Sequence, residues 1–174
     1  MKQLFKLLLI LTPSALPAVT PVPAEVQPGM IPGVKPRNVV FILSDDPGDC
    51  NFSCYGAKLI QTPNIDKLAA AGRRFTDFHA APCCSAARYA LMTGEYNWRR
   101  NVPAVLRGNA PLAIPLDAPT LPSVMKKAGY VTAGVGKWHL GLGNEKNTDF
   151  NNALKPGPLE IGFDHFFGFP ATQD

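Results

Sequence analysis

A chain of 174 residues, with 46% hydrophobic and 17% charged residues, has the composition of a globular protein that can bury one ordinary core. Its formal net charge of +4 is mild and the sequence holds no basic run, which argues against a nucleic-acid-binding protein. No internal repeat is visible.

The N-terminus has the pattern of a secretory signal. Lys2 and Lys6 precede a short apolar stretch and then small residues, so we expect residues 1–24 to be a signal peptide that directs the protein to the periplasm or outside the cell. The apolar stretch is too short for a stable membrane span. A disordered N-terminus is the alternative. Residues 25–36 are rich in proline and predict a linker, so the folded part should begin near Arg37.

The first apolar run after the linker is followed at once by two carboxylates. Asn38–Ser44 reads NVVFILS, a pattern typical of a strand buried on both faces in a parallel sheet. Asp45 and Asp46 follow at its carboxyl end, where ligands bind in open α/β sheets. Adjacent carboxylates repel each other unless a cation lies between them, and such ligands suit Ca²⁺ or Mg²⁺. The alternative is that Asp-Asp-Pro-Gly is only a turn.

Two further segments predict helices. The first should run from a cap at Thr62 to Gly72, with its apolar residues on one packing face. A short strand is expected at residues 75–78. The second helix should begin with a cap at Thr120 and be terminated by Gly129.

Residues 81–96, APCCSAARYALMTGEY, contain two adjacent thiols directly before a helical segment that closes at Gly94. A thiol at a helix N-terminus faces free backbone N–H groups, which favours the thiolate and makes the cysteine reactive. Arg88 lies four residues after Cys84 and can reach back toward it. The alternative is a buried thiol or a disulfide, since four cysteines allow three full pairings.

A second buried strand is expected over Tyr130–Val135, followed by a loop bounded by glycines. Lys137 and His139 lie in this loop, and they should reach the same sheet edge as Asp45 and Asp46. A lysine and a histidine placed there can hold an oxyanion and transfer protons. Each of them alone could equally be a surface charge.

Five segments of the chain resemble, in order, segments of the sulfatase family. Residues 84–94, CSAARYALMTG, resemble the signature C-x-P-x-R followed by four residues and T-G, with Ala86 in the proline's place. The strings SDDPGDCNFSCYGA, TPNIDKLAAAGRRFTDF, GKWHLG and GFDHFFG are similar to other family segments, the last of them as a structural corner. The matches extend from Arg37 to Gly168.

This resemblance implies an α/β, alkaline-phosphatase-like sandwich with a mostly parallel central sheet. Residues 37–174 would be the N-terminal part of its catalytic domain, because the family's distal Asp-Asn metal ligands lie beyond the matched region. The implied activity is hydrolysis of sulfuric esters by a formylglycine made from Cys84. The implied Ca²⁺ or Mg²⁺ ligands are Asp45, Asp46 and the modified Cys84, and the implied catalytic residues are Cys84, Arg88, Lys137 and His139.

The implied partners are a sulfate ester, either an aryl sulfate or a sulfated carbohydrate, and an enzyme that generates formylglycine. Neither nucleic acid nor a stable membrane span is expected. Two rival readings remain open at this point. One is a phosphodiesterase or phosphonate hydrolase of the same superfamily, and the other is a truncated, non-catalytic relative.

Overall fold

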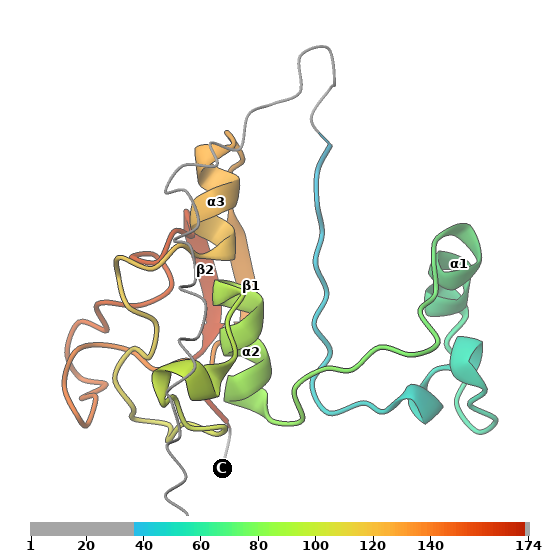
Figure 1. Ribbon diagram of the computed structural model, residues 1–174, viewed down its shortest axis with the longest axis horizontal. Helices are drawn as coiled ribbons and strands as arrows, with labels where there is room; N and C mark the ends of the chain where they lie inside the picture. The colour runs from blue at the N-terminus through green and yellow to red at the C-terminus, as the bar shows by residue number, and fades with distance from the viewer. Residues whose placement is uncertain (1–36, 173–174) are drawn as a thin grey trace, which may run out of the picture.

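The computed structural model of the protein describes residues 37–172. These residues form two regions (Figure 1). Residues 37–80, called the arm, extend away from the rest and carry α1 at their far end. Residues 81–172, called the body, hold the sheet and the other two α-helices beside each other. The predicted signal peptide and linker lie outside the described residues.

The helices and strands are short. The 3₁₀ helices are η1 (Asp49–Asn51), η2 (Ser53–Tyr55) and η3 (Asn97–Arg100), the α-helices are α1 (Pro63–Ala71), α2 (Cys84–Thr93) and α3 (Leu121–Lys127), and the strands are β1 (Ala133–Lys137) and β2 (His165–Phe169). None of the helices within residues 37–172 is both long and apolar enough to cross a bilayer.

The two strands pair in parallel, with Ala133 opposite His165 and Lys137 opposite Phe169. Two more backbone hydrogen bonds prolong this pairing past β1, from Trp138 N–H to the Phe169 carbonyl (3.0 Å) and from His139 N–H to the next carbonyl along, that of residue 170 (2.8 Å). The backbone of residues 137–139 is therefore fixed by the sheet.

The core of the body lies between the sheet, α2 and the loops around them. Its buried members are apolar: Tyr89, Ile114, Trp138, Leu140, Leu142 and Ile161. The Trp138 and Phe166 rings meet edge to face, with centroids 5.9 Å apart. Each fully buried side chain of this size contributes about 1.5–3 kcal/mol to stability, so this cluster is what holds the body together.

The three predicted helices are confirmed, although not in every detail. The side chain of Thr120 caps α3 by accepting a hydrogen bond from Ser123 N–H, as expected, and the helix ends two residues before Gly129. The Thr62 side chain does not cap α1, because it accepts instead from the backbone of Ser53 (3.0 Å). The expected packing face of α1 is also wrong, since this helix has no buried residue.

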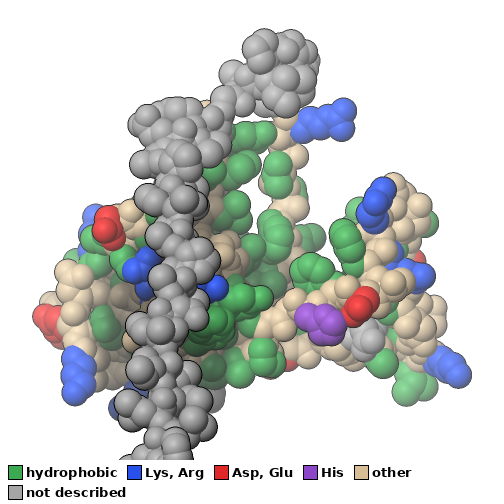
Figure 2. Space-filling model, in the orientation of Figure 1, with side chains coloured by type: hydrophobic (Ala, Val, Ile, Leu, Met, Phe, Trp, Pro, Cys, Tyr) green, Lys and Arg blue, Asp and Glu red, His purple; other side chains and the backbone are tan. Residues whose placement is uncertain are grey.

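The strand predictions were less successful. Asn38–Ser44 pairs with no strand among the described residues. Its apolar side chains are exposed, with Val40 at 83% and Ile42 at 79%. Figure 2 shows hydrophobic side chains at the surface of the molecule. The run has the composition of a buried strand, but burial needs partners that a composition cannot supply. Residues 75–78 are also not a strand.

The second predicted strand begins three residues later than expected and extends to Lys137. It is not buried on both faces. The GFDHFFG segment, expected to be a corner, supplies β2 and is therefore the strand that pairs with β1.

Candidate active site

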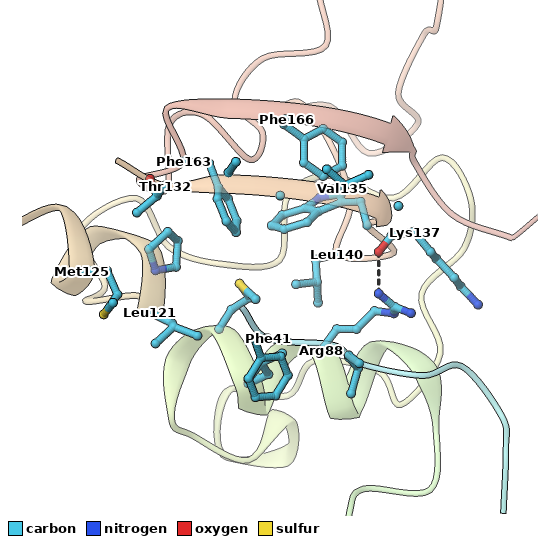
Figure 3. A pocket seen from close by; sticks show the side chains of 18 of the residues that line it. Phe41, Arg88, Leu121, Met125, Thr132, Val135, Lys137, Leu140, Phe163 and Phe166 are labelled. Atoms are coloured by element: carbon cyan, nitrogen blue, oxygen red, sulfur yellow. Dashed lines mark hydrogen bonds between the residues drawn. The ribbon is translucent and has the colours of Figure 1, made fainter. Parts of the chain in front are cut away.

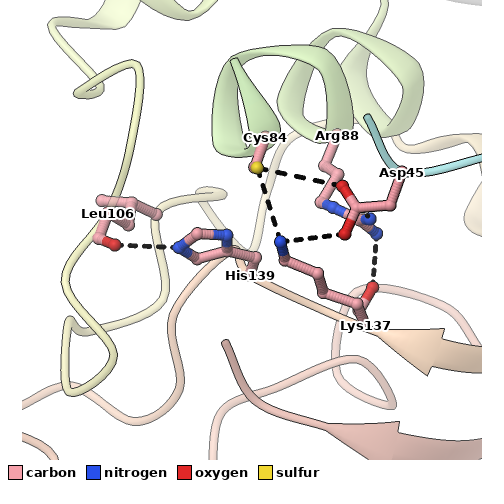
Figure 4. A network of polar contacts seen from close by, with 6 residues as sticks. All are labelled: Asp45, Cys84, Arg88, Leu106, Lys137 and His139. Atoms are coloured by element: carbon pink, nitrogen blue, oxygen red, sulfur yellow. Dashed lines mark hydrogen bonds and ion pairs between the residues drawn. The ribbon is translucent and has the colours of Figure 1, made fainter. Parts of the chain in front are cut away.

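Side chains from the arm, α2 and the end of β1 meet at one point (Figure 4). The Lys137 ammonium lies 3.0 Å from Asp45 Oδ2 and 3.4 Å from Cys84 Sγ. Cys84 Sγ is 3.8 Å from Asp45 Oδ1. The predicted meeting of Asp45 with Lys137 at one edge of the sheet is therefore observed, and Cys84 joins them.

Local backbone geometry places Cys84 at the start of α2. Cys83 is extended (φ −129°, ψ 148°) and Cys84 is the first helical residue. At the other end Gly94 adopts a left-handed conformation (φ 70°) and its N–H donates to the Ala90 carbonyl, which ends the helix. Because Tyr89 is buried in the core, the helix and the Cys84 sulfur are fixed relative to β1.

Arg88 braces this cluster from the next turn of α2. Its guanidinium lies 3.6 Å from Asp45 Oδ1 and also donates to the backbone carbonyl of Lys137. Its side chain is 12% exposed, and its Nε is buried without a hydrogen-bond partner among the described residues. The expected cation beside the Cys84 sulfur is thus Lys137, and Arg88 contacts the residues around it.

The charges in the cluster stabilise one another. The hydrogen bond from Lys137 lowers the pKa of the Asp45 carboxyl, an effect that partial burial opposes and the Arg88 charge reinforces. Partial burial acts to lower the pKa of Lys137, but hydrogen bonds to Asp45 and Cys84 outweigh it and the pKa is raised. Asp45 is therefore an anion and Lys137 a cation at neutral pH.

Asp45, Asp46 and Cys84 each offer one ligand atom, and these atoms lie within 4.8 Å of one another. Asp46 has a left-handed backbone (φ 60°), so the chain turns sharply between the first carboxylate and the residues that follow the second. Carboxylate oxygens are the ligands that Ca²⁺ and Mg²⁺ prefer. The two aspartates fit such an ion in donor type.

His139 is in the same loop but is much more buried, with 1% of its surface exposed. Its Nε2 lies 2.9 Å from the carbonyl oxygen of Leu106, and its Nδ1 has no hydrogen-bond partner among the described residues. In Figure 4 the ring extends from Leu106 toward the side on which Cys84 and Lys137 lie. The alternative of a surface charge at this position is wrong.

The sequence did not point to Leu106 or Ser85, which also shape the site. Ser85 is fully buried and its Oγ accepts a hydrogen bond from Leu106 N–H (3.0 Å). Leu106 acts only through its backbone, which no residue pattern reveals. Ser85 follows the cysteine directly, and that position was the one available signal.

An apolar cavity of about 580 Å³ opens beside the cluster. Asp45, Arg88 and Lys137 border it, and the rest of its lining is mostly apolar (Figure 3). Side chains of the arm at residues 39, 41 and 43 line it opposite α3 and β1. The cavity therefore separates the exposed apolar run of the arm from the sheet.

Comparisons with known proteins identify the family of the chain. A family model described as Sulfatase matches residues 37–174. The chain is 44% identical over 138 residues to an N-acetylgalactosamine-6-O-sulfatase of Bacteroides thetaiotaomicron, covering 79% of this chain and 27% of that protein. It is 40% identical over 142 residues to human arylsulfatase A, covering 80% of this chain and 26% of that protein. The chain thus spans about a quarter of the length of these relatives.

Solved structures give the same answer. One solved structure, whose description concerns the metabolism of multiple glycosaminoglycans by Bacteroides thetaiotaomicron, matches with a TM-score of 0.70 and 45% sequence identity. The match covers 74% of this chain and 27% of that chain. A sulfatase from Pseudoalteromonas sp. matches with a TM-score of 0.56 and 34% identity, covering 71% and 24%. The predicted α/β, alkaline-phosphatase-like fold is confirmed, here as part of a domain with a parallel two-stranded sheet. The chain belongs to the sulfatase family.

Proposed function

We propose that the protein hydrolyses sulfate esters at the cluster of Asp45, Cys84, Arg88 and Lys137, with Asp46 and His139 beside it. The observation that carries this proposal is the position of the Lys137 ammonium, which contacts both Asp45 and Cys84 although the three residues come from separate segments. A sulfatase needs a nucleophile, an anion-binding cation and a carboxylate within a few ångströms of one another, and these contacts bring such groups together.

The charges suit a sulfate group. Lys137 and Arg88 are 11% and 12% exposed, so their cations act where water screens them little. The N-terminus of α2 directs its backbone dipole toward residue 84 and adds to this positive field. These groups would bind the sulfate oxygens and stabilise the negative charge that develops as the ester bond breaks.

Two groups would complete the chemistry. Asp45, Asp46 and residue 84 would hold a divalent cation, Ca²⁺ or Mg²⁺, which when bound would polarise the sulfate group. Conversion of Cys84 to formylglycine would supply the hydroxyl nucleophile. Around them Lys137 would neutralise charge on the sulfate, Arg88 would keep Asp45 and the Lys137 backbone in place, and His139 would take up a proton.

The substrate we propose is an aryl sulfate or a sulfated carbohydrate. The name of the N-acetylgalactosamine-6-O-sulfatase relative supports the carbohydrate. We also propose export to the periplasm or beyond, after cleavage near residue 24, and an enzyme that converts Cys84. Residues 37–174 would form the N-terminal part of the catalytic domain.

Mass spectrometry and kinetics together test the proposal. In protein from its own host, the peptide that holds Cys84 should carry the aldehyde mass at that residue. Sulfate esters should be cleaved faster than matched phosphate esters, and Cys84→Ala should abolish cleavage. Cys83→Ser is the matched control and should keep it. A preference for the phosphate ester would favour the phosphodiesterase reading, and an unmodified, inactive Cys84 would favour the non-catalytic one.

A further inference from the structure

We propose that Ser85 is a positioning residue for His139 and that it acts through the backbone of Leu106. In this arrangement His139 carries its proton on Nε2 and leaves Nδ1 free to accept one. The catalytic consequence rests on the proposed function, whereas the placement of the ring and its proton stands on the contacts alone.

The first step is the attachment of a loop to the first turn of α2. The backbone N–H groups of a first helical turn have no partner inside the helix. Ala86, the third residue of α2, donates its N–H to the Ala104 carbonyl (3.1 Å). One residue earlier, the Ser85 hydroxyl accepts the N–H of Leu106 (3.0 Å). Two adjacent helix residues therefore hold the loop at residues 104–106.

The second step joins that loop to His139. The carbonyl of Leu106 lies 2.9 Å from His139 Nε2. A carbonyl oxygen can only accept, so Nε2 must be the nitrogen that carries hydrogen. When the ring is neutral it holds one hydrogen, and Nδ1 is then bare. This atom is buried and has no partner among the described residues, so it is available to take a proton.

The third step is that Ser85 holds the residue whose carbonyl His139 contacts. The N–H that Ser85 binds and the carbonyl that His139 contacts belong to the same residue, and their positions depend on each other. Ser85 itself cannot shift easily, since it is 0% exposed and lies on a helix that Tyr89 anchors in the core. The backbone of His139 is fixed separately by its N–H bond to the residue 170 carbonyl (2.8 Å). Ser85 is thus left to set the orientation of the ring.

Nitrogen NMR of the imidazole is the direct test, because it identifies which ring nitrogen bears hydrogen. In the unaltered protein the Nε2–H form of His139 should outnumber the Nδ1–H form by about tenfold, as one net hydrogen bond allows. In Ser85→Ala this ratio should fall severalfold, while Ser85→Thr, which keeps the hydroxyl, should restore it. Per chain converted to formylglycine, Ser85→Ala should lower kcat by about tenfold and leave KM nearly unchanged.

Ser123→Ala is the matched control. Ser123 is also a first-turn serine whose Oγ accepts a backbone N–H, that of Thr120 (2.9 Å), but it lies on α3. Its loss should leave the His139 signals unchanged. If Ser85→Ala does not fold, Ser85→Cys, with a weaker acceptor in the same place, should give an intermediate ratio.

Two results would overturn the inference. A dominant Nδ1–H form in the unaltered protein would contradict the proton assignment, and an unchanged ratio in folded Ser85→Ala or Ser85→Cys would remove the role of Ser85. The predicted NMR pattern in a protein that cleaves no sulfate ester would instead count against the proposed function and leave the placement intact.

Discussion

The arm and the body are ordered in different ways. The body has a cluster of buried apolar side chains, whereas no described residue from 37 to 83 is buried. The arm nevertheless contains a regular helix, α1, which shows that local hydrogen bonds and helix propensity alone can form an element here. The difference is between structure that depends on local contacts and structure that depends on a core.

Side-chain hydrogen bonds supply the local order of the arm. The Ser53 hydroxyl and the Thr62 hydroxyl are 2.8 Å apart, and both contact the Asp66 carboxylate, at 2.6 Å and 3.2 Å. Asp66 also lies in the first turn of α1, where its negative charge interacts favourably with the helix dipole. This network joins η2 to α1 without a core.

The candidate site lies where the two regions meet. Asp45 belongs to the arm, while Cys84, Arg88 and Lys137 belong to the body. Chemistry at this site should therefore depend on the arm, whereas stability should depend on the body. The following predictions separate these two contributions.

Among the variants that compare the arm with the body, the largest effect should come from Asp45→Asn. Loss of the carboxylate charge should weaken metal binding and lower turnover by about 10²–10³-fold, as removal of one electrostatic contact to a transition state does. The free energy of unfolding of the body should change by about 1 kcal/mol or less, because Asp45 is 43% exposed. Kinetics and denaturant titration measure the two quantities.

Asp77→Asn is the control for Asp45→Asn. Asp77 is also in the arm and is 87% exposed, with a neighbour in His79 at 3.6 Å, and its loss should leave turnover unchanged. If Asp45→Asn kept full activity and metal affinity, Asp45 would have no part in the chemistry.

The next effect concerns stability alone. Leu140 is 0% exposed within the core, so Leu140→Ala should lower the free energy of unfolding by about 2–5 kcal/mol. Leu68→Ala removes the same atoms from α1, where the side chain is 67% exposed. This variant should change the free energy of unfolding by no more than about 0.5 kcal/mol. Equal losses in the two variants would show that α1 packs as tightly as the core.

The sequence predicted best what local chemistry decides. The helix beside the two thiols, the Thr120 cap and the glycine after Thr93 follow from residue type and position, and all three are observed. The meeting of Asp45 with Lys137 was predicted from the rule that ligands gather at strand ends. That pairing was found even though the run before Asp45 is not a paired strand.

The failures involve contacts between distant segments. The burial of Asn38–Ser44 depends on partners that the run itself cannot specify, so its apolar composition was misleading. The hydrogen bonds of Leu106 to Ser85 and His139 span 21 and 33 positions and use backbone atoms, which carry no residue signature. The Thr62 hydroxyl accepts a hydrogen bond from the backbone of Ser53, nine residues away, and does not cap α1.

A smaller effect is expected from an aspartate in the body. Asp164 accepts hydrogen bonds from Thr132 N–H (2.9 Å) and pairs with Lys126 (2.6 Å), and these contacts, led by Lys126, lower its pKa to about 2. A lowered pKa means that its stabilisation is complete above the unfolded value of 3.8 and is lost as the pH falls through about 2.

The stability difference between the unaltered protein and Asp164→Asn should therefore shrink as the pH falls from 4 toward about 2. Lys126→Met should raise the pKa of Asp164 and move the loss to higher pH. Lys127→Met is the control, because Lys127 has no ion pair among the described residues, and it should leave the pH dependence unchanged. Denaturant titrations across this pH range measure the effect, and a constant difference would refute it.

The smallest effect should be confined to the arm. Asp66→Ala removes the acceptor shared by Ser53 and Thr62, so α1 should open more often. Because these hydrogen bonds are partly exposed and water screens them, their loss should have a modest effect, and we expect amides in α1 to exchange about three to tenfold faster. The melting temperature of the body should stay the same, since no residue of α1 is buried.

Hydrogen exchange read by mass spectrometry resolves the two regions, with Asp77→Ala as the control. Faster exchange that extended into α2 or β1 would mean that the arm and the body unfold together, and the contrast between local and core-dependent order would not hold.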